Sequence, residues 1–242
     1  MNKYVSLSAA DAKNIARDPM LVLAVFGPLI LAVAIRYGMK ILSGWLHLTL
    51  AFDLTVYYDL ILIEALLLIP LMLGVIAGFL MLDERDENLI AYFAVTPLTK
   101  SGYLLYRLSS PVLLSAAYTV FFVYFTDLVR VPVAALLPLT LLLALQAPVV
   151  ALLLLAFAAN KVEGMALSKG IGVTMAAPLA IYFAPEPWSW LASVLPTFWI
   201  AKAYWAGMEA WSGGTFFIYL AAFAFYSLLA VWLYRRFEQR ND

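Results

Sequence analysis

The sequence of 242 residues contains no cysteine and a single histidine, His47. Disulfide bridges, thiol chemistry and a Cys/His zinc site are therefore excluded. Charged side chains are also scarce, at 12% of the chain, and the fifteen basic and fifteen acidic residues cancel. A balanced charge gives no overall field that favours nucleic acid. With hydrophobic residues at 65%, too few polar side chains remain to cover a soluble globule, so we predict an integral membrane protein.

Six apolar runs are long enough to cross a membrane, because about twenty apolar residues span a hydrocarbon core of about 30 Å. These runs cover about 19–36, 61–82, 104–127, 133–158, 165–185 and 215–234. The first run is short and could continue as an exposed helix into 37–45. The sequence therefore predicts an all-α integral membrane protein with six transmembrane helices in a single transmembrane domain, 1–242.

The lysines and arginines outside these runs are distributed unevenly between the two sides of the membrane. If the N-terminus is cytoplasmic, Arg36, Lys40, Arg130 and Lys202 fall on the outer side, and the other eleven of the fifteen fall on the inner side. Connections rich in Lys and Arg remain in the cytoplasm. We therefore predict a multi-pass protein of the cell (plasma) membrane with both termini cytoplasmic.

The stretch 186–214 holds five of the seven tryptophans and one lysine, Lys202. A seventh crossing here would place Lys202 deep in lipid, where a charge costs about 2.5–3.5 kcal/mol on insertion scales. We instead predict an outer re-entrant hairpin over about 188–210, with a break at Pro196. The alternative is an aromatic belt on an ordinary loop.

The segment between the second and third runs reads "MLDERDENLIAYFAVTPLTKSGYLLYR" and carries five successive charges from Asp83 to Glu87. Charges at this density cannot lie in hydrocarbon, so the chain has left the membrane by Asp83. Asp83 is a candidate N-cap, and the acidic residues after it suit the first turn of a helix. An apolar face with Leu89 and Phe93 follows. We predict a short cytoplasmic helix that a partner can bind; the alternative is a solvated connection that packs back on the protein or on headgroups.

Two further segments accompany this one: "KNIARDPML" at 13–21, and "ANKVEGMALSKGIG" at 159–172 followed by "LPTFWIAKAYWAG". In this order the segments resemble the membrane subunits of ATP-binding-cassette exporters of the ABC type-two permease family, over essentially the whole chain. The resemblance implies an N-terminal amphipathic helix at about 6–18 along the inner surface. It also implies a coupling helix from Glu84 to Phe93 in a groove of a separate ATPase subunit.

The residues that the resemblance assigns to ATPase coupling are Glu84, Arg85, Asp86, Glu87, Leu89 and Phe93. The implied partners are an ABC ATPase subunit, a second permease copy or a related permease, and membrane lipid. ATP would be bound by the partner, because the chain contains no G-x-x-x-x-G-K-[ST] phosphate-binding loop. We therefore expect a transport subunit without an ATPase site, a catalytic residue, a metal or a cofactor of its own.

Gln146 is the polar side chain deepest in the fourth run, and polar groups at membrane depth are candidates for function. It could bond a carbonyl freed by Pro148 or line a transport pathway. Glu64, near the start of the second run, is placed at the outer headgroup level.

The resemblance implies an export permease that moves its substrate out of the cell, driven by ATP hydrolysis in the separate subunit. Charges are nearly absent from the middles of the runs, which suits a hydrophobic or amphipathic substrate such as a drug, peptide or lipid. Two other functions suit the sequence less well. A stand-alone channel or secondary transporter would need ion-handling side chains at mid-membrane, where the chain offers little beyond Gln146. An intramembrane metalloenzyme would need several converging ligands, which a single histidine does not supply.

Overall fold

A computed structural model describes residues 19–87, 99–209 and 211–241 of the chain. In these ranges every regular element is helical. Six helical stretches of the described part are long and apolar enough to cross a membrane: Phe26–Leu50, Leu54–Asp86, Gly102–Thr126, Val133–Phe157, Lys161–Phe183 and Gly213–Gln239. The predicted fold class, an all-α integral membrane protein with six transmembrane helices, is confirmed.

The first stretch is one helical path made of α2 (Pro19–Val33), a π-helical turn η1 (Ala34–Gly38) and α3 (Met39–Leu50). It runs well beyond the predicted end at Arg36, because no proline follows until Pro70 and the helix is free to continue. The Arg36 guanidinium donates to the carbonyl oxygen of Phe125 and lies 4.8 Å from the centroid of that ring. The π-helical turn is therefore fixed to the last turns of the third helix.

Helices α4 (Tyr58–Asp86) and α7 (Val133–Phe157) form the centre of the molecule. A short 3-10 helix, η2 (Leu54–Tyr57), leads into α4. Helix α7 packs against α4, α6 (Thr99–Thr126) and three later helices, and most of its side chains are buried. A helix that is apolar on all sides belongs in such a central position. Its two prolines, Pro138 and Pro148, lie inside an unbroken helix, as membrane helices allow.

The backbones of α4 and α7 come unusually close at two glycines of α4, Gly74 and Gly78. A Cβ atom on Gly74 would lie 2.4 Å from the carbonyl oxygen of Ala147, and one on Gly78 would lie 2.6 Å from Cδ1 of Leu154. Small residues four apart permit this approach between membrane helices. The sequence G-x-x-x-G at 74–78 therefore fixes the spacing of the two central helices.

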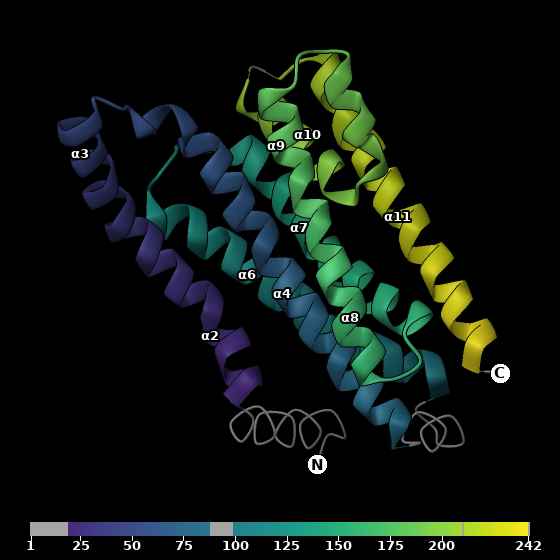
Figure 1. The fold of residues 1–242 in the computed structure, drawn as a ribbon. Helices are drawn as coiled ribbons and strands as arrows, with labels where there is room; N and C mark the ends of the chain where they lie inside the picture. The colour runs from purple at the N-terminus through teal and green to yellow at the C-terminus, as the bar shows by residue number, and fades with distance from the viewer. Residues whose placement is uncertain (1–18, 88–98, 210, 242) are drawn as a thin grey trace.

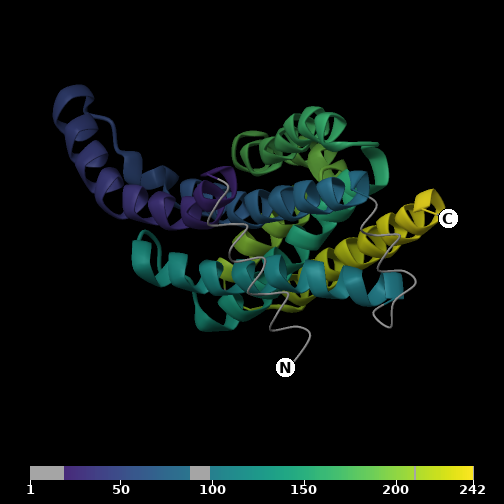
Figure 2. The same ribbon diagram turned by 90° about the horizontal axis from the view of Figure 1, so that it is seen from below.

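The fifth stretch joins α8 (Lys161–Gly172), η3 (Val173–Met175) and α9 (Ala176–Phe183), and the chain ends with α11 (Gly213–Asn241). In Figures 1 and 2, α2–α3 and α11 lie on opposite sides of the central pair. Seen from below in Figure 2, α8–α9 and α6 cover opposite faces of α4. The helices therefore surround α4 and α7 as an outer layer.

Between α9 and α11 lie a 3-10 helix, η4 (Trp188–Val194), and α10 (Pro196–Met208). Leu195 is extended, so the chain breaks just before Pro196. The 13 residues of α10 span about 20 Å, which is too short for a crossing of about 30 Å. That η4 and α10 enter and leave the membrane on one side stays a prediction.

One end of the bundle gathers the ends of α4, α7 and α11 and the beginnings of α6 and α8; we call it the basal end, and it is the lower end in Figure 1. Its helices are joined by contacts between Glu84 and Arg107, between Arg85 and Ala158, and between Asp83 and Lys161. The placement of this end in the cytoplasm rests on the charge distribution and stays a prediction.

Candidate functional site at the end of helix α4

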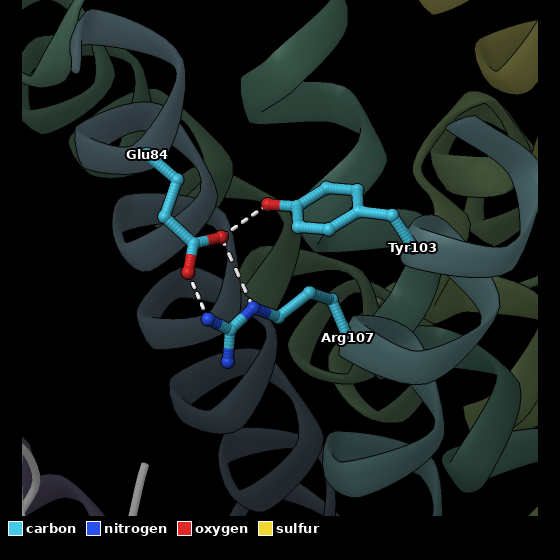
Figure 3. Close-up of polar contacts among 3 residues, drawn as sticks. All are labelled: Glu84, Tyr103 and Arg107. Atoms are coloured by element: carbon cyan, nitrogen blue, oxygen red, sulfur yellow. Dashed lines mark hydrogen bonds and ion pairs between the residues drawn. The ribbon is translucent and has the colours of Figure 1, made fainter. Parts of the chain in front are cut away.

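Glu84 lies in the last turns of α4 and joins this helix to α6. Arg107 Nε donates to Glu84 Oε2 at 3.0 Å, and Arg107 Nη2 forms an ion pair with the other oxygen. The Tyr103 hydroxyl also donates to Glu84 Oε2 (Figure 3). Tyr103 and Arg107 are four residues apart, so both face α4 from one side of α6. The Glu84 and Arg107 side chains are only 12% and 16% exposed, so the two-pronged pair is largely withdrawn from solvent.

Arg85, the next residue, points to α7. Its guanidinium donates to the carbonyl oxygen of Leu155 at 3.1 Å and to that of Ala158 at 2.5 Å. The last carbonyls of a helix have no partner within the helix and carry its negative partial charge. Arg85 therefore caps the C-terminus of α7, and successive residues of α4 hold two different neighbours.

Asp83 and Asp86 face the start of α8. The Lys161 Nζ atom lies 2.6 Å from Asp83 Oδ2, and the Lys161 backbone N–H donates to Asp86 Oδ2 at 3.4 Å. Lys161 begins a well-capped helix, because Asn160 accepts from the Glu163 N–H and the Glu163 carboxylate accepts from the Ala159 N–H. The side chains of Asp83 and Lys161 are each about 40% exposed, so this ion pair adds less than the Glu84 pair.

The structure brings Glu84, Arg85 and Asp86 together in one charged cluster, with Glu87 exposed just beyond it. The predicted N-cap at Asp83 is wrong: Asp83 to Asp86 continue α4 as its last turn, because these side chains bond α6, α7 and α8 and hold the helix together. The other predicted coupling residues, Leu89 and Phe93, lie outside the described residues. So does the predicted amphipathic helix at 6–18.

Gln146 is 2% exposed and lies between the two central helices. Its Nε2 donates to the carbonyl oxygen of Leu67 on α4 at 3.4 Å. The carbonyl that it bonds is therefore on the neighbouring helix and is not one freed by Pro148. A role for Gln146 in a pathway stays a prediction, and it requires that α4 and α7 separate.

A second set of contacts joins the opposite end of α4 to the aromatic segment before α11. The Tyr204 hydroxyl donates to Asp59 Oδ1 at 3.0 Å. Lys202 Nζ lies 2.7 Å from Glu186 Oε1 and 5.3 Å from the centroid of the Trp190 ring. The Lys202 ammonium group lowers the pKa of the Glu186 carboxyl through a hydrogen bond and its charge. Lys202 is thus paired, and its placement outside the hydrocarbon stays a prediction.

Comparison with known proteins identifies the family of this chain. The sequence model of the fluoroquinolones export permease protein Rv2686c-like family matches residues 11–235. Two curated proteins, named fluoroquinolones export permease protein Rv2686c and fluoroquinolones export permease protein MT2760, come from two strains of Mycobacterium tuberculosis, H37Rv and CDC 1551 / Oshkosh. Each is 33% identical over 235 residues, which cover 96% of this chain and 92% of the relative. This chain belongs to the Rv2686c-like family. No solved structure matches it.

Membership of the Rv2686c-like family agrees with the resemblance to the ABC type-two permeases and with a permease that acts in export. The family members named above are permeases, so a transport role is supported and an enzymatic one is not. Among the described residues, no group of three His, Cys, Asp or Glu side chains could hold a metal ion. The charged cluster of this Rv2686c-like permease joins α4 to α6, α7 and α8.

Sequence reasoning missed the residues that complete the cluster in this family member. Tyr103, Arg107 and Lys161 give Glu84 and Asp83 their partners. The one available signal was the spacing of Tyr103 and Arg107, which puts a hydroxyl and a guanidinium on one helix face next to an acidic run. The G-x-x-x-G at 74–78 was also missed, although it is a known packing motif of membrane helices.

Proposed function

We propose that this chain is the membrane subunit of an ATP-driven exporter that moves an amphipathic drug of the fluoroquinolone kind out of the cell. The observation that carries the proposal is the 33% identity, over 96% of the chain, to a protein named fluoroquinolones export permease. A match over nearly the whole length of both chains favours a shared transport task, whereas a match over a single helix would not.

The energy source that we propose is a separate ATPase subunit. The chain has no phosphate-binding loop of the G-x-x-x-x-G-K-[ST] kind, so ATP would be hydrolysed in another polypeptide. The segment from Glu84 to Phe93 would dock on that subunit from the basal end. The bias of lysines and arginines toward this side of the membrane supports a cytoplasmic position for it.

The charged cluster would transmit movement of the docked ATPase to the membrane helices. Movement of the end of α4 would be passed to α6 through the pair of Glu84 with Arg107, and to α7 through the bonds of Arg85 to the Leu155 and Ala158 carbonyls. Because three helices are held at one point, a small displacement there would tilt them together. Such tilting would alternately open the pathway to the two sides of the membrane.

A pathway requires a second permease, either another copy of this chain or a related one. Most side chains of the first stretch, Phe26–Leu50, are not buried inside the chain, so they are available to lipid or to a second subunit. A symmetric pair would use the same surface on both copies and enclose the substrate between them. The apolar helices suit an amphipathic drug better than a hydrated ion.

The first experiment is purification of the protein from its native membrane in mild detergent, with identification of every protein that accompanies it and a measurement of ATPase activity. We expect a stoichiometric nucleotide-binding subunit with ATPase activity, and weaker retention of it by Glu87→Gln, which changes an exposed side chain beyond the charged cluster. A variant with Glu209→Gln, an exposed acidic residue after α10, is the control and should retain the partner.

The second experiment measures transport with inside-out vesicles that contain the purified complex. We expect uptake of a fluorescent fluoroquinolone to require ATP and to fail with a non-hydrolysable analogue. If the protein purifies alone and the drug moves without ATP, the proposal is wrong and the stand-alone channel or secondary transporter takes its place. If ATP drives no movement of the drug but a partner ATPase is present, only the choice of substrate is wrong.

A further inference from the structure

A groove opens at the basal end between the last residues of α7 and the last turns of α11. Its volume is about 470 Å³, and its lining residues are Ala156, Phe157, Arg236 and Gln239. The charged cluster of α4 uses none of these side chains. The groove is therefore a separate feature of the molecule.

The groove combines one cation, Arg236, with one aromatic wall, Phe157, which a second ring supports from outside. The Arg236 guanidinium lies 5.0 Å from the centroid of the Phe157 ring, and the Trp232 ring is tilted against Phe157 with centroids 5.9 Å apart. Trp232, Arg236 and Gln239 recur at intervals of four and three residues, so they share one face of α11. Phe157 and Trp232 are 41% and 52% exposed, which leaves their rings open to a ligand or to lipid.

Arg236 is exposed and forms no ion pair with any carboxylate of the described residues. The nearby Glu238 accepts a hydrogen bond from the Tyr234 hydroxyl at 2.6 Å, and residues two apart on a helix do not face each other. The C-terminus of α7, which would repel an anion, is capped by Arg85 through the carbonyls on either side of Ala156 and Phe157. The groove thus offers a positive charge that no carboxylate of the described residues pairs, where the negative partial charge at the end of α7 is already neutralised.

The position of the groove along α11 fits the headgroup level of a membrane. Arg235 and Arg236 end the apolar part of the helix, and Trp232 lies one turn before them, where interfacial tryptophans occur. Basic pockets between helices on the cytoplasmic side bind anionic lipid headgroups. We propose that this groove binds an anionic phospholipid, with Arg236 on the phosphate, the Gln239 amide as a second donor, and an acyl chain along Phe157 and Trp232.

The test is native mass spectrometry of the purified full chain with phosphatidylglycerol and, separately, phosphatidylcholine. The wild type should retain phosphatidylglycerol preferentially, and Arg236→Gln should reduce that preference about five-fold, because a contact between one arginine and an anionic headgroup contributes about 1 kcal/mol. Arg235→Gln is the matched control, because it removes the same charge from an exposed neighbour outside the groove and should leave the preference unchanged.

Two further variants distinguish a loss of lipid binding from a failure to fold. Arg236→Lys retains the charge and should retain most of the lipid, whereas Gln239→Ala should lose part of it; all variants are compared after gel filtration at the same elution volume. Equal losses in Arg235→Gln and Arg236→Gln, or equal retention of both lipids by the wild type, would overturn the proposal. Displacement of phosphatidylglycerol by a fluoroquinolone would also overturn it, since the groove would then take the carboxylate of the drug.

Discussion

Replacing Gly74 by alanine should push the two central helices apart. The new Cβ would lie 2.4 Å from the Ala147 carbonyl oxygen and 2.8 Å from Val150 Cβ. The first distance is 1.0 Å below the 3.4 Å at which ordinary contact begins (3.4 − 2.4), and the atom that it meets is backbone, which cannot rotate away. Overpacking of this kind costs about 1–3 kcal/mol, against a gain of about 1 kcal/mol from the better helix propensity of alanine.

Gly78 and Gly44 provide a graded comparison. A Cβ on Gly78 meets the end of the Leu154 side chain at 2.6 Å, which can move, and a Cβ on Gly44 in α3 meets nothing within 4 Å. We therefore expect Gly74→Ala to lower the unfolding temperature in detergent most, Gly78→Ala less, and Gly44→Ala not at all or in the opposite direction. Thermal unfolding followed by size-exclusion chromatography measures the order. The same stability for Gly74→Ala and Gly44→Ala would refute the close packing of α4 on α7.

Three further predictions concern charged residues. Glu84→Gln leaves the largely buried Arg107 guanidinium without its carboxylate and should destabilise the protein by about 3 kcal/mol; the double variant Glu84→Arg with Arg107→Glu should restore part of this stability in a double-mutant cycle. Arg85→Ala uncaps α7, so hydrogen exchange at amides 153–157 should accelerate, whereas Arg85→Lys should lie between; unchanged exchange would contradict the cap. The pKa of Glu186 is lowered in the folded protein, so the stabilisation by this carboxylate is present above its ordinary pKa of 4.5 and is lost as the pH falls through the lower folded pKa. The unfolding temperatures of wild type and Glu186→Gln should therefore differ at pH 7 and converge as the pH falls below 4.5.

The number of membrane helices could be predicted because the membrane fixes the length of an apolar run. A run such as 133–158 has no other favourable place, and α7 occupies Val133–Phe157. The end of α4 could not be predicted in the same way. Five charges from Asp83 indicate that the chain has left the hydrocarbon, but they do not say whether the helix stops there. It continues because α6, α7 and α8 supply partners.

The charged residues of the candidate site could be predicted from the sequence, but their partners on the neighbouring helices could not. An acidic run with one arginine is visible in the sequence, so Glu84, Arg85 and Asp86 could be named. Their partners depend on how α6 and α7 are rotated and shifted relative to α4, and no local pattern records that register. Gln146 illustrates the point, because a local rule suggested a carbonyl near Pro148, whereas its nearest acceptor is Leu67 on another helix.

The π-helical turn at Ala34–Gly38 sets the direction in which the side chains of α3 point relative to those of α2. In an α-helix each residue advances the side chains by about 100°, so a turn that accommodates one extra residue rotates α3 by that angle relative to α2. Arg36 lies inside this turn and faces α6. Deletion of one residue in this turn would rotate α3, so that its outward side chains, such as Leu48, would face a different side of the molecule. No other residue of the sequence would have to change.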